Sequence, residues 1–158
     1  MGGGTAFKIY LPRVGEAAQA YKPHHEVEEN LGGTETILLA EDDERVRGLV
    51  RAVLEGYGYR VLEAEDGDAA LSVSERSADP IHLLLTDVVM PKMSGRELAD
   101  RLARSRPEMR VLYVSGYTDE AVVHHGVLDA DTPFLQKPFE PDALARKVRE
   151  VLDAEARR

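Results

Sequence analysis

Short apolar runs alternate with longer segments of helical spacing from Thr34 onward. Five runs have the length of buried strands, and they span 36–40, 60–64, 81–86, 110–114 and 132–136. Between them, apolar residues recur every three or four positions, which predicts helices over about 46–57, 66–77, 94–106, 118–127 and from 141 onward. Strands that alternate with helices predict an α/β fold, a doubly wound parallel sheet of five strands covered on both faces.

The residues at the ends of these elements support the boundaries. Asp66 and Ser94 are typical N-caps, and Asp43 is predicted to cap the first helix. Gly58 is predicted to end that helix, since glycine readily adopts the left-handed conformation found there. Pro141 can begin the last helix because the first helical residue needs no amide hydrogen.

Polar residues follow four of the five predicted strands. Glu41 and Asp42 follow the first, Asp87 the third, Ser115 the fourth and Lys137 the fifth. Parallel sheets of this kind place their sites at the carboxyl ends of the strands. For any one of these residues, an ion pair at the rim of a loop is a sufficient explanation. The convergence of four strand ends favours a functional site. The second strand is expected at the edge of the sheet.

Glu41, Asp42 and Asp87 would bring three carboxylates together. Two like charges ~4 Å apart repel by roughly 4 kcal/mol at an effective dielectric constant near 20. A hard divalent cation relieves that repulsion, and oxygen ligands suit Mg²⁺. With Mg²⁺ and Lys137 present, the pocket can bind a phosphoryl group. Asp87 is then the natural nucleophile, and the Ser115 hydroxyl can stabilise the transferring group.

The composition restricts the alternatives. The chain has 158 residues, no cysteine and a formal net charge of −9. Disulfide and thiolate chemistry are therefore excluded, and a general nucleic-acid surface is disfavoured. No apolar run approaches the length that spans a membrane, so we expect no direct membrane contact by this domain.

Residues from about 34 to 152 resemble the receiver domain of two-component response regulators. The resemblance rests on four segments, and each lies at a strand end: Glu41-Asp42-Asp43-Glu44, Asp87-Val-Val-Met-Pro91-Lys-Met-Ser-Gly95, Val114-Ser115-Gly116 and Lys137-Pro138-Phe139. It implies a flavodoxin-like fold of five βα units with strand order 2-1-3-4-5. It also implies that the domain takes a phosphoryl group from phosphohistidine and switches its surface.

The resemblance assigns a role to each residue of the pocket. Asp87 is expected to be the phosphoacceptor. Asp42, Asp87 and the backbone carbonyl of Val89 are expected to bind Mg²⁺. Many members have Asp where this chain has Glu41, so Glu41 is expected to act through water.

Three further residues complete the expected machinery. Lys137 is expected to contact the phosphoryl group, and Ser115 to act as the switch hydroxyl. The aromatic residue that rotates in many relatives corresponds to Phe134. Phe134 has no hydroxyl, so a rotation here would act through packing and not through a hydrogen bond to Ser115.

The first residues carry a second resemblance. Residues 1–13, MGGGTAFKIYLPR, resemble the end of a histidine-kinase ATPase domain, although a leader of arbitrary origin is an alternative. Residues 14–33 are rich in small and acidic residues and are interpreted as a linker, which leaves 34–158 as the receiver. We therefore expect the C-terminal receiver of a hybrid sensor histidine kinase.

As such a piece, the chain is expected to accept phosphoryl groups and to have no kinase activity of its own. Its phosphodonor would be the parent kinase or a histidine phosphotransfer protein. We expect a cytoplasmic location for the domain, because phosphohistidine forms where ATP is available, while the parent can be membrane-bound. The sequence leaves homodimer formation open.

Three other functions fit parts of the pattern. An aspartyl phosphatase of the haloacid dehalogenase type also uses a strand-end Asp, but needs a second Asp where this chain has Val89. A flavin-binding protein of similar fold would place phosphate after the first strand, where Glu41 and Asp42 repel it. The third is a receiver that binds partners without being phosphorylated.

Overall fold

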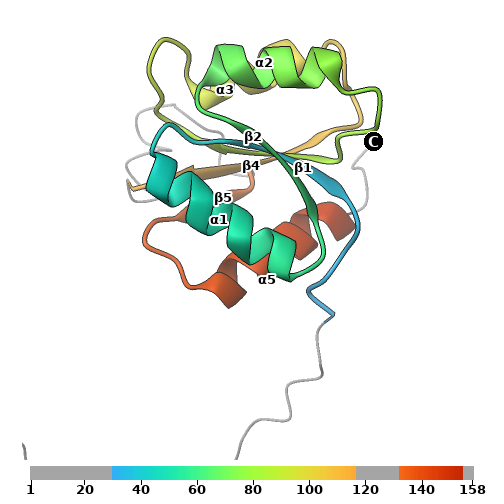
Figure 1. The fold of residues 1–158 in the computed structure, drawn as a ribbon, viewed down its shortest axis with the longest axis vertical. Helices are drawn as coiled ribbons and strands as arrows, with labels where there is room; N and C mark the ends of the chain where they lie inside the picture. Colours follow the sequence, from blue (N-terminus) through green and yellow to red (C-terminus); the bar gives the residue numbers. More distant parts are fainter. Residues whose placement is uncertain (1–29, 117–131, 155–158) are drawn as a thin grey trace, which may run out of the picture.

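The computed structural model describes residues 30–116 and 132–154 (Figure 1). The kinase-like segment 1–13, most of the predicted linker and the helix predicted over 118–127 lie outside the described residues. In the part that is described, no helix is both long enough and apolar enough to cross a lipid bilayer.

Five parallel strands form one sheet with the order β2-β1-β3-β4-β5. The strands are β1 (Thr36–Ala40), β2 (Arg60–Ala64), β3 (Leu83–Asp87), β4 (Arg110–Ser115) and β5 (Phe134–Gln136). The predicted order is confirmed, with β2 at the edge. β5 begins two residues later than predicted, since Pro133 has no amide hydrogen for the strand ladder.

Helices cover both faces of the sheet, as a doubly wound fold requires (Figure 1). The buried Leu and Val residues of α1 (Glu44–Gly56) and α5 (Pro141–Asp153) belong to one core cluster, which includes Leu54, Leu85 and Val148. The buried Ala and Leu residues of α2 (Gly67–Arg76) and α3 (Gly95–Leu102) belong to a second cluster. Every residue of β1 is buried, because core side chains lie on both of its faces.

The predicted N-caps are confirmed. Asp43 accepts hydrogen bonds from the amides of Arg45 and Val46, at 2.8 and 3.1 Å. Asp66 caps α2 and Ser94 caps α3 in the same way. The cap at Asp43 matters for the site, because it starts α1 directly after the acidic pair and so fixes where that pair lies.

Candidate functional site

The acidic residues meet because β1 and β3 are neighbours. Ala40 pairs with Thr86, so the next residues along the two strands, Glu41 and Asp87, leave the sheet side by side. Glu41 is held further by its amide, which donates to the carbonyl of Ala64 at 3.2 Å. Its side chain is buried, with a residue exposure of 4%.

Asp42 joins the same cluster. Carboxylate oxygens of Glu41, Asp42 and Asp87 lie within 4.8 Å of one another. Three oxygen donors of like charge at this spacing fit a hard divalent cation such as Mg²⁺. The predicted carboxylate ligands are therefore brought together.

Lys137 lies between two of these acids. Its Nζ donates to Oε2 of Glu41 at 2.6 Å and to Oδ2 of Asp87 at 2.9 Å. The backbone helps to place it, since the Lys137 amide donates to the carbonyl of Ser115 at 2.8 Å. The peptide bond between Lys137 and Pro138 is cis.

The environment changes the pKa of both partners of this ion pair. Burial raises the pKa of Glu41 and nearby Asp87 adds to that effect, while Lys137 acts against both. Burial acts to lower the pKa of Lys137, but its bonds to Glu41 and Asp87 outweigh burial and raise it. The lysine is therefore firmly protonated and serves as the internal counter-ion of the pocket.

The loop after β3 packs very closely against the nucleophile candidate. A Cβ atom on Gly95 would lie 2.1 Å from the carbonyl oxygen of Asp87 and 2.9 Å from Oγ1 of Thr86. The Gly95 amide also donates to the carbonyl of Val88 at 3.1 Å. Gly95 therefore lets the loop return against the end of β3. A glycine at the start of a predicted helix is a weak signal, and its role was not predicted.

Val89 occupies the outer rim of the pocket. Its side chain is 60% exposed, and its amide lies 3.4 Å from Oδ1 of Asp87. The two oxygens of Asp87 thus differ, because Lys137 holds Oδ2 tightly whereas Oδ1 has a weak backbone donor. The metal-binding role of the Val89 carbonyl stays a prediction.

Arg47 contributes to the pocket and was also not predicted. Its Nη1 donates to the backbone carbonyl of Glu41 at 2.7 Å, and its Nε lies 3.8 Å from Glu63. A faint signal for Arg47 is present in the sequence, since this positive charge falls between the core positions Val46 and Val50 of α1. Arg47, which lies on α1, therefore helps to hold the backbone of the acidic pair Glu41 and Asp42 in place.

The two predicted switch residues lie on neighbouring strands. Ser115, the last residue of β4, has an exposure of 1%. Phe134 begins β5, is half-buried and pairs in register with Tyr113. Phe134 packs against the core cluster that contains Tyr113. The predicted rotation of Phe134 and the predicted switch role of Ser115 stay predictions.

A comparison with known families identifies the domain. The family model described as response regulator receiver domain matches residues 37–149. The chain belongs to this family. The match runs from β1 to α5 and so contains every residue of the pocket.

Two relatives come from Brucella abortus (strain 2308). The sensor kinase CckA is 39% identical over 161 residues, covering 97% of this chain and 17% of the kinase. The response regulator receiver protein CpdR is 35% identical over 118 residues, covering 75% of this chain and 97% of CpdR. The chain thus spans about a sixth of the kinase and nearly all of the receiver protein.

Solved structures agree with the fold. The receiver domain of the hybrid histidine kinase CckA has a TM-score of 0.63 and 34% identity, covering 74% of this chain and 98% of that one. The chemotaxis protein CheY4 of Vibrio cholerae has a TM-score of 0.65 and 27% identity, covering 75% and 99%. The chain is therefore a receiver domain of two-component signalling.

Proposed function

We propose that Asp87 accepts a phosphoryl group from phosphohistidine, with Mg²⁺ bound by the acidic cluster. The observation that carries the proposal is the arrangement of Lys137, Asp87 and the two neighbouring acids at one edge of the sheet. Membership of the receiver family supports the same chemistry.

The pocket residues would share the work of the transfer. An oxygen of Asp87 attacks phosphorus, a P–O bond forms, and the P–N bond of the donor breaks with its electron pair remaining on the imidazole. Asp42 and Asp87 would hold Mg²⁺, with Glu41 acting through water and the Val89 carbonyl as a further ligand. Bound Mg²⁺ supplies positive charge that offsets the charge on the transferring group.

Lys137 would then change partners. In the unphosphorylated pocket it binds Glu41 and Asp87. After transfer, its ammonium group binds a phosphoryl oxygen, and Ser115 donates its hydroxyl to another. Ser115 would leave space behind it on β4, and Phe134 would turn inward to fill that space, altering the surface around β5 and α5.

The experiment is intact mass after incubation with Mg²⁺ and acetyl phosphate. We expect one added phosphoryl group on the unaltered chain and none on Asp87→Asn. Asp43→Asn is the matched control, because asparagine preserves the helix cap while removing a neighbouring charge, and it should be phosphorylated normally. An adduct on Asp87→Asn would mean that another residue is the acceptor. No adduct on the unaltered chain would favour a receiver that acts unphosphorylated.

The parent is proposed to be a hybrid histidine kinase. The alignment with the sensor kinase covers 97% of this chain, whereas that with CpdR covers 75%. The difference supports residues 1–13 as the end of an ATPase domain, 14–33 as a linker and 34–158 as the receiver. A cytoplasmic location and a phosphohistidine donor in the parent or in a phosphotransfer protein follow from the same proposal.

A further inference from the structure

The chain is held firmly just before it enters β1. The Tyr59 hydroxyl donates to the carbonyl of Leu31 at 2.8 Å, and the Gly33 amide donates to the carbonyl of Tyr57 at 3.1 Å. The Arg60 amide donates to the carbonyl of Glu35 at 3.0 Å. Alternate residues of 31–35 are thus hydrogen-bonded to the turn between α1 and β2. We call residues 31–35, together with residues 57–60 at this turn, the joint.

Two glycines make the joint close-fitting. Gly58 has a φ of +92°, and a Cβ there would lie 2.8 Å from the carbonyl oxygen of Gly33. A Cβ on Gly33 would lie 2.1 Å from Oε2 of Glu35 and 2.5 Å from Cε1 of Tyr59. Backbones that approach this closely fit in one arrangement and tolerate little sliding.

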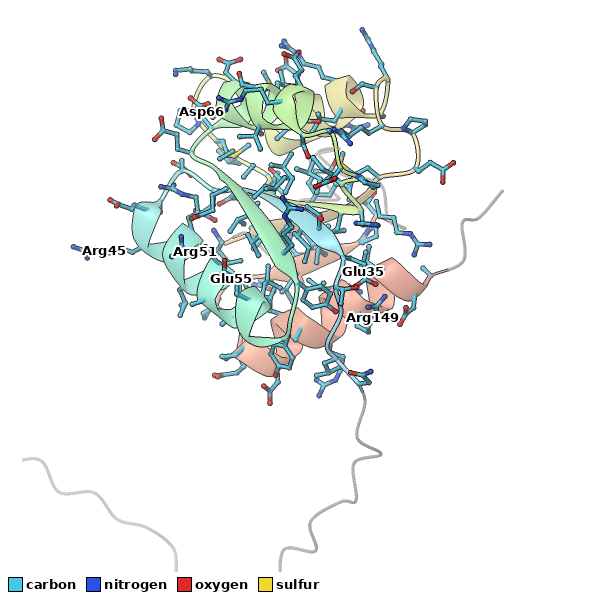
Figure 2. All side chains as sticks on the ribbon, turned by 45° about the vertical axis from the view of Figure 1, so that its right-hand side comes forward. Glu35, Arg45, Arg51, Glu55, Asp66 and Arg149 are labelled. Atoms are coloured by element: carbon cyan, nitrogen blue, oxygen red, sulfur yellow. The ribbon has the colours of Figure 1, made fainter. Side chains whose placement is uncertain are left out.

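The joint is also tied to α5, which comes from the far end of the chain. Nη1 of Arg149 lies 2.8 Å from Oε1 of Glu35, and Figure 2 shows the two side chains where the chain entering β1 passes α5. Asp153 accepts from Nε and Nη2 of Arg149, at 2.9 and 2.7 Å. Asp153 therefore orients the guanidinium group that holds Glu35.

This ion pair is incompletely satisfied. Oε2 of Glu35 is buried and, within the described residues, has no hydrogen-bond partner. Leaving a buried acceptor unpaired is unfavourable, because the lost contact with water is not replaced. The contact between Glu35 and Arg149 is thus held against a desolvation penalty, and it depends on where α5 lies.

The phosphoacceptor pocket lies at the other end of the same helix. Lys137, which binds Asp87, precedes the start of α5 at Pro141 by a short connection. Leu144 and Val148 bury one face of α5 in the core, and the helix is continuous from Pro141 to Asp153. A change of partner by Lys137 therefore reaches Arg149 through a rigid element.

We propose that the joint couples α5 to the segment that precedes the receiver, so that phosphorylation loosens the hold on residues 31–35. The coupling rests on the proposed function of Asp87. It gives the domain a route to the preceding part of its own chain. The close fit includes the contact of Arg149 on α5 with Glu35, so a displacement of α5 weakens it.

Hydrogen exchange of the whole chain, with and without Mg²⁺ and acetyl phosphate, tests the coupling. In the unaltered chain we expect the amides of residues 31–35 and 57–60 to exchange several-fold faster after phosphorylation. Arg149→Gln should exchange fast in both states. Lys147→Gln, which removes an ion pair with Glu150 on the same helix, is the control and should respond like the unaltered chain. Glu35→Gln, which preserves shape, serves as a second variant if Arg149→Gln does not fold.

Intact mass measured on the same samples separates the two proposals. A phosphorylated chain with unchanged exchange at the joint would overturn the coupling and leave the proposed function standing. A full response in Arg149→Gln or in Glu35→Gln would overturn it too. Absence of any phosphoryl adduct would overturn the proposed function, and the coupling with it.

Discussion

Lys137 approaches Glu41 more closely than it approaches Asp87, at 2.6 Å against 2.9 Å. The ammonium group therefore neutralises the acidic pair as well as the proposed nucleophile. A divalent cation at the same acids would take over part of this neutralisation. Lysine and cation are thus partial substitutes for each other.

Replacing Lys137 tests that relation. In Lys137→Gln, Glu41 and Asp87 face each other without a counter-ion, and we expect the unfolding free energy without divalent cations to fall by about 1–3 kcal/mol. Mg²⁺ should then raise the melting temperature more than in the unaltered chain. Lys147→Gln, in an ion pair with Glu150 on α5, is the control. An equal effect of Mg²⁺ on all three proteins would contradict the idea.

Gly95 should tolerate no side chain. In Gly95→Ala the new Cβ would collide with the carbonyl of Asp87, so we expect a loss of about 1–3 kcal/mol in urea unfolding. Gly48 on α1 is the matched control, since a Cβ there meets nothing within 4 Å. Gly48→Ala should stabilise by about 0.5–1 kcal/mol because alanine favours the helix. Equal effects would mean that the loop after β3 relaxes freely.

Arg106 joins the end of α2 to the loop after α3. Its guanidinium group donates to Oγ and the carbonyl of Ser74, at 2.8 and 2.7 Å, and to the carbonyls of Ser77 and Asp79, at 2.8 and 3.2 Å. Lysine cannot reproduce this fork, so Arg106→Lys should cost about 1–3 kcal/mol by chemical denaturation. Arg104→Lys, at an exposed position, should change stability by less than about 0.5 kcal/mol. Similar losses in both would show that the fork contributes little.

Asp66 takes part in both a helix cap and a surface ion pair, and two substitutions can separate their contributions. It accepts from the amide of Ala69 at 2.8 Å and from Nζ of Lys92 at 3.0 Å, and it is labelled in Figure 2. Asp66→Asn retains the cap and should lower the melting temperature only slightly, because Lys92 is largely exposed. Asp66→Ala also loses the cap and should lower the melting temperature further, measured by thermal unfolding. A larger loss in Asn than in Ala would reverse this ranking.

Stability should fall on acidification partly through Glu35. Burial acts to raise the pKa of Glu35, but its own backbone amide and Arg149 outweigh burial and hold the pKa below the ordinary 4.5. The unfolded chain therefore takes up the proton first as the pH falls. The contribution is complete above the ordinary value and is lost as the pH falls through the lower folded value.

The measurement is the slope of unfolding free energy between about pH 5 and about pH 3. Glu35→Gln should show a shallower fall than the unaltered chain, because its amide does not titrate. Asp153 also accepts hydrogen bonds from Arg149, so Asp153→Asn is measured beside it. Identical slopes in the unaltered chain and in Glu35→Gln would contradict the lowered pKa.

Both the sheet and the edge of the sheet that carries the pocket can be predicted from the order of residues alone. The apolar run Leu83 to Leu85 and the other apolar runs need burial on both faces of the sheet. This burial requires helices above and below a parallel sheet. Asp43, Asp66 and Ser94 fixed helix starts through local hydrogen bonds. These properties depend on periodicity and on near neighbours, and a sequence displays both directly.

Which side chains are in contact depends on how the elements pack in three dimensions. Lys137 and Glu41 are 96 positions apart, and their contact depends on how the end of β5 faces the end of β1. The close approach of Gly95 to the Asp87 carbonyl and the contact of Arg149 with Glu35 likewise depend on how separate segments pack. The spacing of residues along the chain does not reveal such contacts, because they are determined by how whole elements pack.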